Sequence, residues 1–201
     1  MNLLIGVSAS VAAIKLGEVK KRIKERCAES NLDVEIKYVA TTLAYDNFLK
    51  PLDFDEKVLL DKDEWAWQKM GDDILHVELR KWADLFVICP MDANTLASVS
   101  SGACPNLLTC ICRCWDFKKP MLVFPCMNTH MYEHPVTREQ MKRIMSWGVQ
   151  VVEPVEKLLA CGDYGIGALP PVEDVVGEIV KYIKRHHLEV EKKKIHTTQV
   201  C

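Results

Sequence analysis

The chain has 201 residues, 49% of them hydrophobic, and a formal net charge of −2. This length suits one domain whose core is large enough to fold without disulfides or a structural metal. The near-neutral charge gives no general attraction to nucleic acid or to an anionic membrane, so we expect neither partner. The basic residues of Lys181–Arg185 and Lys192–Lys194 are typical of a solvated helix face and a tail.

The cysteine content indicates the redox environment of the protein. Nine cysteines are present, an odd number, and no secretory leader precedes the first apolar segment. We therefore expect free thiols and a cytoplasmic location. Cys110, Cys112 and Cys114 follow i, i+2, i+4 spacing on a predicted helix, which divides them between faces. Buried side chains are the better interpretation, and we expect no metal.

Short apolar runs alternate with helical patterns along the chain. The runs predicted as strands are Leu3–Val7, Val34–Ala40, Val58–Leu60, Leu85–Cys89, Met121–Phe124 and Val149–Val152. Continuously apolar strands separated by helices indicate a parallel sheet with helices on both faces. The prediction is an α/β fold, with one domain over residues 1–186 and a flexible tail over 187–201, where apolar periodicity is lost.

Two helices carry start signals in the sequence. Thr137 and Gln140 form a capping-box pattern that predicts a helix start, and Gly148 predicts the end of that helix. Pro171 predicts the start of the last helix. The apolar face of that helix is formed by Val175, Val176, Ile179, Val180 and Ile183.

Polar residues follow the predicted strands, where an open parallel sheet binds its ligands. These segments are Gly6-Val7-Ser8-Ala9-Ser10, Thr41-Thr42, Pro90-Met91-Asp92-Ala93-Asn94-Thr95 and Pro125-Cys126-Met127-Asn128. Each alone fits a turn or helix cap, but the recurrence at four strand ends favours a ligand crevice. No dinucleotide or Walker fingerprint is present, so the first loop suits a single phosphate, as in FMN.

A glycine-rich segment, Leu158–Ala168, contains Cys161 and Asp163. It is predicted as a loop that can close over the site as a flap, the alternative being a surface turn. An exposed thiol in such a loop is liable to oxidation, which favours a functional role for Cys161. His76, His130 and His134 compete as catalytic histidines, and the residues alone leave that choice open.

In order and spacing, these segments resemble the flavin-containing cysteine decarboxylases, specifically the phosphopantothenoylcysteine decarboxylases. The resemblance extends from Leu3 to about Ile183 and is strongest over Leu75–Thr95, Asn106–Asn128 and Leu159–Ala168. It implies a flavodoxin-like (Rossmann-like) domain that binds FMN and forms a homotrimer with sites at subunit interfaces. It also implies decarboxylation of 4′-phosphopantothenoylcysteine to 4′-phosphopantetheine in coenzyme A biosynthesis.

The reaction implied by this resemblance lends the substrate a temporary electron sink. The flavin oxidises the substrate thiol to a thioaldehyde, carbon dioxide leaves, and the flavin returns the hydride while an acid supplies a proton. His76 matches the catalytic histidine, Cys161 the proton donor on the flap, and Asn128 the asparagine that holds the substrate carboxylate. Further substrate contacts fall on Lys157, Ala160 and Leu169. FMN contacts fall on Gly6, Ser8, Ser10, Thr41, Thr42, Asp92, Asn94, Thr95 and the backbone at Cys126.

Four positions depart from the family pattern, namely Pro105, Tyr132, Leu158 and Leu169. They bear on substrate-phosphate and flap contacts more than on the core chemistry. Competing interpretations are a non-catalytic regulatory subunit of the phosphatase-inhibitor type, a peptidyl-cysteine decarboxylase, a flavin prenyltransferase and a flavin-free phosphopeptide or small-molecule binder. The presence of His76, Asn128 and Cys161 in one chain favours a self-sufficient enzyme.

Overall fold

The structure, a computed structural model, describes residues 1–198, with side chains described as far as Lys192. Within this part of the chain, six strands form one parallel sheet in the order β3-β2-β1-β4-β5-β6. They are β1 (Asn2–Val7), β2 (Glu35–Ala40), β3 (Val58–Leu59), β4 (Leu85–Met91), β5 (Met121–Pro125) and β6 (Gln150–Val151). The predicted strands and the α/β class are confirmed.

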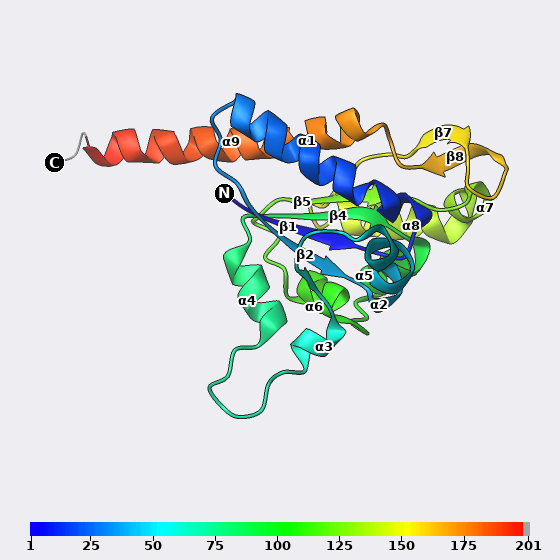
Figure 1. The fold of residues 1–201 in the computed structure, drawn as a ribbon, viewed down its shortest axis with the longest axis horizontal. Coiled ribbons are helices and arrows are strands. Elements are labelled where there is room, and N and C mark those ends of the chain that lie inside the picture. Colours follow the sequence, from blue (N-terminus) through cyan, green and yellow to red (C-terminus); the bar gives the residue numbers. More distant parts are fainter. Residues whose placement is uncertain (199–201) are drawn as a thin grey trace.

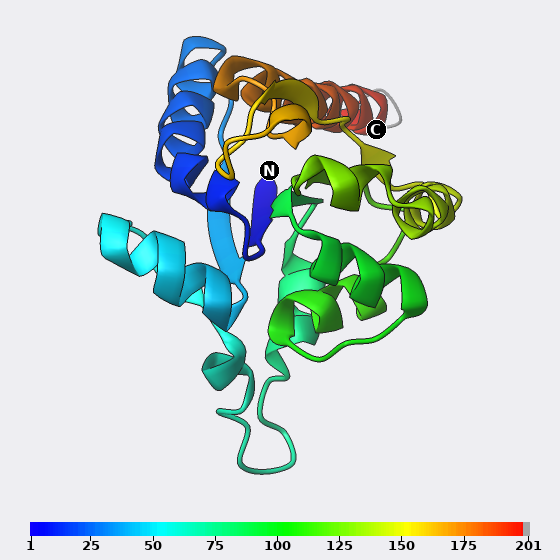
Figure 2. The ribbon, with the colours of Figure 1, turned by 90° about the vertical axis from the view of Figure 1, so that its right-hand side faces the viewer.

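Helices cover both faces of the sheet, as predicted (Figures 1 and 2). On one face lie α1 (Leu16–Glu29) and α9 (Val172–Thr198). On the other lie α4 (Leu75–Trp82), α5 (Ala93–Ser101), α6 (Leu107–Cys114) and α8 (Pro135–Met145). Each strand contributes side chains to the core on both faces of the sheet, because alternate side chains point to opposite faces. Leu3 and Ile5 of β1 pack in the cluster with α1 and α9, whereas Leu4 packs in the other cluster.

Short elements connect these layers around the carboxyl edge of the sheet. The chain leaves β1 into a 3-10 helix, η1 (Val11–Lys15), and leaves β2 into α2 (Thr42–Ala44), η2 (Tyr45–Leu49) and η3 (Lys50–Leu52). Helix α3 (Asp61–Glu64) follows β3, and α7 (Thr129–Glu133) follows β5. Parallel strands all point the same way, so the segments that follow them gather at one edge.

The glycine-rich segment is a β-hairpin, where a loop was predicted. Strands β7 (Val155–Leu158) and β8 (Tyr164–Ala168) pair antiparallel at the carboxyl end of the main sheet (Figure 1). Most of β7 is solvent-exposed on both faces, with Glu156, Lys157 and Leu158 all exposed. The hairpin therefore lacks the apolar alternation by which a half-buried strand is identified.

The predicted start of the helix at Thr137 is wrong. Helix α8 begins at Pro135 and is capped by His134, whose Nδ1 accepts a hydrogen bond from the Val136 amide at 3.2 Å. Proline is pre-organised for the first helical position, so the helix starts two residues earlier. Thr137 is instead buried inside the first turn. The predicted end holds approximately, since α8 ends at Met145 and Gly148 adopts φ +96° in the turn that follows.

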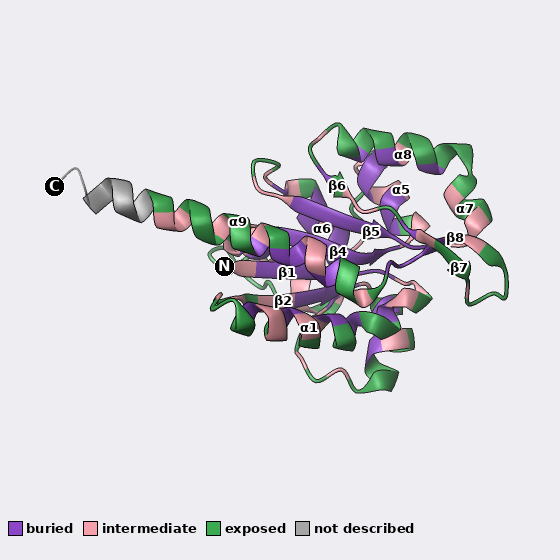
Figure 3. Cartoon of the chain, turned by 90° about the horizontal axis from the view of Figure 1, so that it is seen from above, coloured by how far each residue is buried: buried purple, intermediate pink, exposed green. Residues whose placement is uncertain are grey.

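Helix α9 begins after Pro171 as predicted, and all five residues of its predicted apolar face are buried. The segment predicted as a tail is helical as far as Thr198, and residues 199–201 lie outside the described residues. Residues 187–192 of α9 project beyond the sheet (Figure 3), and Leu188 among them is exposed. Lysine and glutamate favour helix without burial, and Arg185 pairs with Glu189 at 3.1 Å. Flexibility of this segment stays a prediction.

Among the described helices, including the 27-residue α9, none is both long and apolar enough to cross a membrane.

Gly6 provides a test of the packing between β1 and α6. A Cβ on Gly6 would lie 2.4 Å from Leu108 Cδ1, whereas one on Gly17 would meet nothing within 4 Å. We expect Gly6→Ala to lower the free energy of unfolding by about 1–3 kcal/mol through overpacking. Gly17→Ala, the matched control in α1, should raise it by about 0.5–1 kcal/mol. Urea denaturation measures both, and equal effects of the two substitutions would contradict the packing described.

Candidate active site

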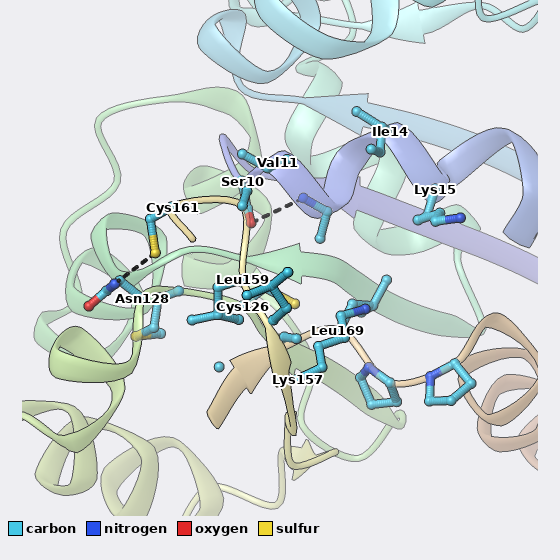
Figure 4. Close-up of a pocket in the computed structure, with 18 of the residues that line it drawn as sticks. Ser10, Val11, Ile14, Lys15, Cys126, Asn128, Lys157, Leu159, Cys161 and Leu169 are labelled. Carbon is cyan, nitrogen blue, oxygen red and sulfur yellow. Dashed lines mark hydrogen bonds between the residues drawn. The ribbon is translucent and has the colours of Figure 1, made fainter. Parts of the chain in front are cut away.

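A pocket of about 530 Å³ lies at the carboxyl edge of the sheet. Its walls come from η1, the end of β5, the β7–β8 hairpin and the start of α9 (Figure 4). Seven of the predicted site residues line it: Ser10, Cys126, Asn128, Lys157, Ala160, Cys161 and Leu169. The pocket therefore combines residues from four segments that are distant in sequence.

Asn128 and Cys161 meet at one end of the pocket. Asn128 Nδ2 donates to Cys161 Sγ at 3.3 Å and to Asp163 Oδ2 at 3.4 Å, and Cys161 Sγ donates to the same Asp163 oxygen at 3.3 Å. Asn128 also caps α7, because its Oδ1 accepts from the His130 amide at 2.9 Å. This cap fixes the amide orientation, so that the NH₂ group faces the hairpin.

The hairpin is held against the end of β5 by backbone contacts. The Met127 amide donates to the Gly167 carbonyl at 3.0 Å, and Thr129 Oγ1 donates to the Ile166 carbonyl at 2.8 Å. A Cβ at Gly167 would lie 2.0 Å from the Met127 carbonyl oxygen, and Gly167 adopts φ +135°. Glycine is required there by both the close approach and the backbone conformation.

The interior of the pocket is largely apolar and its cations lie at the rim. Cys126 and Leu169 are buried, and burial raises the pKa of the Cys126 thiol to about 12, which keeps it uncharged. Lys157 and Ala160 are exposed on the hairpin. Of the family departures, Leu158 and Leu169 both line this pocket.

The other two departures lie outside the pocket lining. The Tyr132 hydroxyl hydrogen-bonds Glu153, and burial together with this carboxylate raises the pKa of Tyr132. Pro105 is exposed and precedes the α6 cap Asn106, so it stands one residue outside the helix.

Several predicted cofactor residues serve the fold at the β1–β4 junction. Ser8 is fully buried; its hydroxyl donates to the Pro90 carbonyl at 3.0 Å and accepts from the Asp92 amide at 2.6 Å. Gly6, in β1, faces Leu108 of the covering helix α6. Ser10, by contrast, is partly exposed, caps η1 by accepting from the Ala12 amide at 3.4 Å, and lines the pocket.

The remaining predicted cofactor residues lie at the same edge outside the pocket lining. Asp92 caps α5 by accepting from the Thr95 amide at 2.8 Å, and Asn94 is exposed on its first turn. Thr95 Oγ1 is buried and has no hydrogen-bond partner. After β2, Thr41 caps α2 because its Oγ1 accepts from the Ala44 amide at 3.2 Å. Thr42 Oγ1 donates to Asp61 Oδ2 at 2.9 Å.

His76 does not line the pocket. It lies in the first turn of α4, on the opposite face of the sheet from α1 and α9. Glu64 holds it twice, through the His76 amide at 3.0 Å and through Nδ1 at 2.5 Å. Of the two competing histidines, His134 caps α8 and His130 is exposed beside Asn128, and neither lines the pocket.

The fold brings to this site several residues that no sequence motif marks. Lys15, Glu18, Val11 and Ile14 enter the pocket from η1 and the start of α1. Their only signal in sequence was position, since η1 follows the first polar strand end. Glu64 gave no signal either, because it is separated from His76 by a segment without apolar periodicity.

Comparison with known proteins places the chain among flavin-binding proteins. A family model described as Flavoprotein matches residues 1–184. The chain belongs to this family. It is 41% identical over 186 residues to phosphopantothenoylcysteine decarboxylase of Mus musculus, covering 92% of this chain and 88% of the relative. It is 44% identical over 171 residues to that of Oryza sativa subsp. japonica, covering 84% of this chain and 74% of the relative.

Solved structures of similar proteins share the fold. A PPC decarboxylase with a cysteine-to-serine mutation, complexed with pantothenoylaminoethenethiol, superposes with a TM-score of 0.83 at 38% identity, covering 91% of this chain and 98% of that one. The FMN binding protein AtHal3 superposes with a TM-score of 0.79 at 38% identity, covering 90% and 95%. The resemblance to this family and the flavodoxin-like fold are thereby confirmed.

Gly167 provides a test of how the hairpin is held. We expect Gly167→Ala to weaken the docking of the hairpin by about 2–3 kcal/mol, because neither backbone segment can move aside and the φ value is strained. Amide hydrogen exchange at Met127 and across β8 should accelerate. Gly162→Ala is the matched control: its φ is +93°, but its Cβ would meet nothing within 4 Å. Unchanged exchange at Met127 in Gly167→Ala would contradict this account.

Proposed function

We propose that this protein is an FMN-dependent phosphopantothenoylcysteine decarboxylase, which converts 4′-phosphopantothenoylcysteine to 4′-phosphopantetheine in coenzyme A biosynthesis. The observation that carries the proposal is the contact between Asn128 and Cys161 at one end of a pocket at the strand ends. The family resemblance implies substrate binding for Asn128 and proton donation for Cys161, and the two residues are 33 positions apart in the chain. Membership of the Flavoprotein family supports the cofactor.

The residues at the carboxyl edge fit FMN. Ser10, Thr41 and Asn94 offer neutral hydrogen-bonding groups from three neighbouring strand ends, and the buried Thr95 hydroxyl is left without a partner by the protein itself. The uncharged Cys126 thiol suits an apolar ring. When bound, FMN supplies a reversible hydride acceptor that makes loss of carbon dioxide from the oxidised substrate feasible.

Asn128 is suited to hold the substrate carboxylate. Its Oδ1 is occupied by the cap of α7, so Nδ2, a donor, faces the pocket. A carboxylate accepts hydrogen bonds and cannot donate them when ionised. Asn128 Nδ2 would therefore donate to the substrate carboxylate, in place of the Asp163 oxygen that it contacts in this structure. This hydrogen bond would position the carboxylate for the reaction.

Cys161 is suited to supply the proton. A thiol carries an S–H group that can pass its proton to a base on the substrate. Cys161 Sγ is exposed, accepts from Asn128 and donates to Asp163, so its hydrogen atom is already directed by the hairpin turn. Asn128 and Cys161 thus bring carboxylate binding and proton donation to the same end of the pocket.

The rest of the pocket fits a long substrate that ends in an anion. Val11, Ile14 and Leu169 form apolar walls, and Lys15 lies away from the Asn128–Cys161 end (Figure 4). Lys157 supplies a second cation on the hairpin. Lys15 is paired with Glu18 at 3.2 Å, and Glu18 also lines the pocket, so Lys157 is the cation better placed for an anionic group. A cation here favours a phosphorylated substrate over a peptide that ends in cysteine, the alternative with identical chemistry at the carboxyl end.

We also propose that the protein is a homotrimer in which a neighbouring subunit supplies His76. Within one chain His76 is on the far face from the pocket, with Nδ1 bound to Glu64, which leaves Nε2 free to face outward. The segment that precedes His76 exposes large apolar side chains: Trp65 is 81%, Met70 89% and Ile74 46% exposed. Apolar clusters of this kind are typical of surfaces that bind another chain.

Two further features bear on the alternatives. A regulatory subunit would not need His76, Asn128 and Cys161 together, so their joint presence favours catalysis. The cysteines of the described residues are free thiols, which supports the proposed cytoplasmic location.

The purified chain tests the proposed function directly. We expect flavin absorbance in the visible spectrum and carbon dioxide release from 4′-phosphopantothenoylcysteine without an added reductant. Cys161→Ser should bind flavin and substrate but accumulate the decarboxylated, still-oxidised enethiol, because the proton donor is lost. Mass spectrometry of the products distinguishes the two proteins. A colourless protein that retains no added FMN would overturn the proposal, and full turnover by Cys161→Ser would reject the role of Cys161.

Mixing two inactive variants tests the shared site. His76→Asn and Cys161→Ser should each lack turnover, and subunits exchanged between them should recover about a quarter of the wild-type rate, because that fraction of random interfaces pairs two intact groups. Mixtures without subunit exchange are the control. Flavin content should stay equal in both variants. If exchanged mixtures stay inactive, His76 and Cys161 act within one chain or not at all.

A further inference from the structure

The thiols of α6 form a second group of reactive side chains, outside the pocket. Cys104 is exposed just before the helix, and Cys110 is partly exposed on its second turn. Cys110 Sγ donates to the backbone carbonyl oxygen of Cys104 at 3.4 Å. The Cys110 thiol therefore lies against the backbone of Cys104.

The segment between these cysteines is held by a capping box. Asn106 Oδ1 accepts from the Thr109 amide at 2.9 Å, and Thr109 Oγ1 accepts from the Asn106 amide at 3.2 Å. Leu107 donates its amide to Asp61 at 2.7 Å, which ties the helix start to α3. The start of α6, which directly follows Cys104 and Pro105, is anchored in this way.

The other two cysteines of α6 have different surroundings. Cys112 is buried in the core, and burial raises the pKa of its thiol. Cys114 is on the same face as Cys110, one turn further on, but its Sγ donates to the carbonyls of His76 at 3.7 Å and Ile111 at 3.5 Å. Among the thiols of α6, Cys110 is thus the one directed at Cys104.

We propose that Cys104 and Cys110 form a reversible intrachain disulfide, which makes this surface a thiol–disulfide exchange site. The co-reactant is a low-molecular-weight disulfide of the glutathione class. The inference does not depend on the proposed decarboxylase activity, because neither cysteine lines the pocket.

The exchange proceeds in two balanced steps. The exposed Cys104 thiolate attacks one sulfur of oxidised glutathione, the glutathione S–S bond breaks, and one glutathione thiolate leaves and takes up a proton. Cys110 then loses its proton and attacks the Cys104 sulfur of this mixed disulfide, releasing the second glutathione. Two protein thiols are oxidised to one disulfide, and oxidised glutathione is reduced to two thiols.

The order of attack follows from exposure and charge. Burial, together with the neighbouring groups Cys104, Glu64 and Cys114, raises the pKa of the Cys110 thiol to about 11. Few Cys110 thiolates exist in solution at neutral pH, so Cys104 is the entry point and Cys110 resolves the mixed disulfide. Resolution is intramolecular, and the Cys110 thiol already lies against the Cys104 backbone, which compensates for the small thiolate fraction.

This reaction can be tested with the purified full-length chain. The reduced protein is incubated with oxidised glutathione, remaining thiols are blocked with N-ethylmaleimide, and chymotrypsin cleaves between the two cysteines after Leu107 or Leu108. We expect mass spectrometry to find the Cys104 and Cys110 peptides joined by a disulfide as the main product at these positions. Excess reduced glutathione should return both to maleimide-reactive thiols.

Three conservative variants make the assignment specific. In Cys110→Ser, Cys104 should retain a glutathione adduct, and in Cys104→Ser, Cys110 should stay a free thiol. Cys114→Ser, the matched control on the same helix face, should form the disulfide as the wild type does. The proposal is overturned if wild-type Cys104 carries only glutathione or joins another cysteine. The wild-type result decides this even if a variant folds poorly, which circular dichroism would report.

Discussion

The backbone hydrogen bond between the Met127 amide and the Gly167 carbonyl is the contact on which the pocket depends. It joins the end of β5, in the rigid sheet, to a hairpin whose first strand is largely exposed. Only glycine allows this approach, because any Cβ at Gly167 would collide with the backbone. With the hairpin held there, Cys161 in its turn reaches Asn128, and the apolar walls of η1 and α9 gain a facing side.

Several polar side chains at the strand ends make hydrogen bonds that stabilise the fold. The Ser8 hydroxyl ties the end of β1 to the end of β4, and Asp92 caps α5. Asn128 has both roles, because its Oδ1 caps α7 and its Nδ2 donates to Cys161 Sγ. Caps and a ligand crevice are therefore compatible explanations of the same residues, because helix starts and ligand sites occupy the same edge of a parallel sheet.

The chemical groups are divided between the two faces of the sheet. Asn128 and Cys161 border a pocket toward α1 and α9, whereas His76 is fixed by Glu64 on the side of α4 and α6. The thiol pair of Cys104 and Cys110 lies on that second side as well, with Glu64 among the charges near Cys110. The second face thus carries both the proposed subunit contact and the proposed exchange site. Subunit assembly and thiol oxidation would therefore involve the same surface.

The amino-acid sequence by itself determined the sheet and the core, because Leu3–Val7, Leu85–Cys89 and the stripe from Val175 to Ile183 carry periodicities that only buried strands and a one-sided helix satisfy. It also predicted which residues bear chemistry, and the fold brings seven of these to one pocket. Tertiary structure alone decided that β7 and β8 form a hairpin, that His134 rather than Thr137 starts α8, and that Lys15 enters the pocket while His76 does not. These outcomes depend on contacts between segments far apart in the chain, and local periodicity carries no information about such contacts.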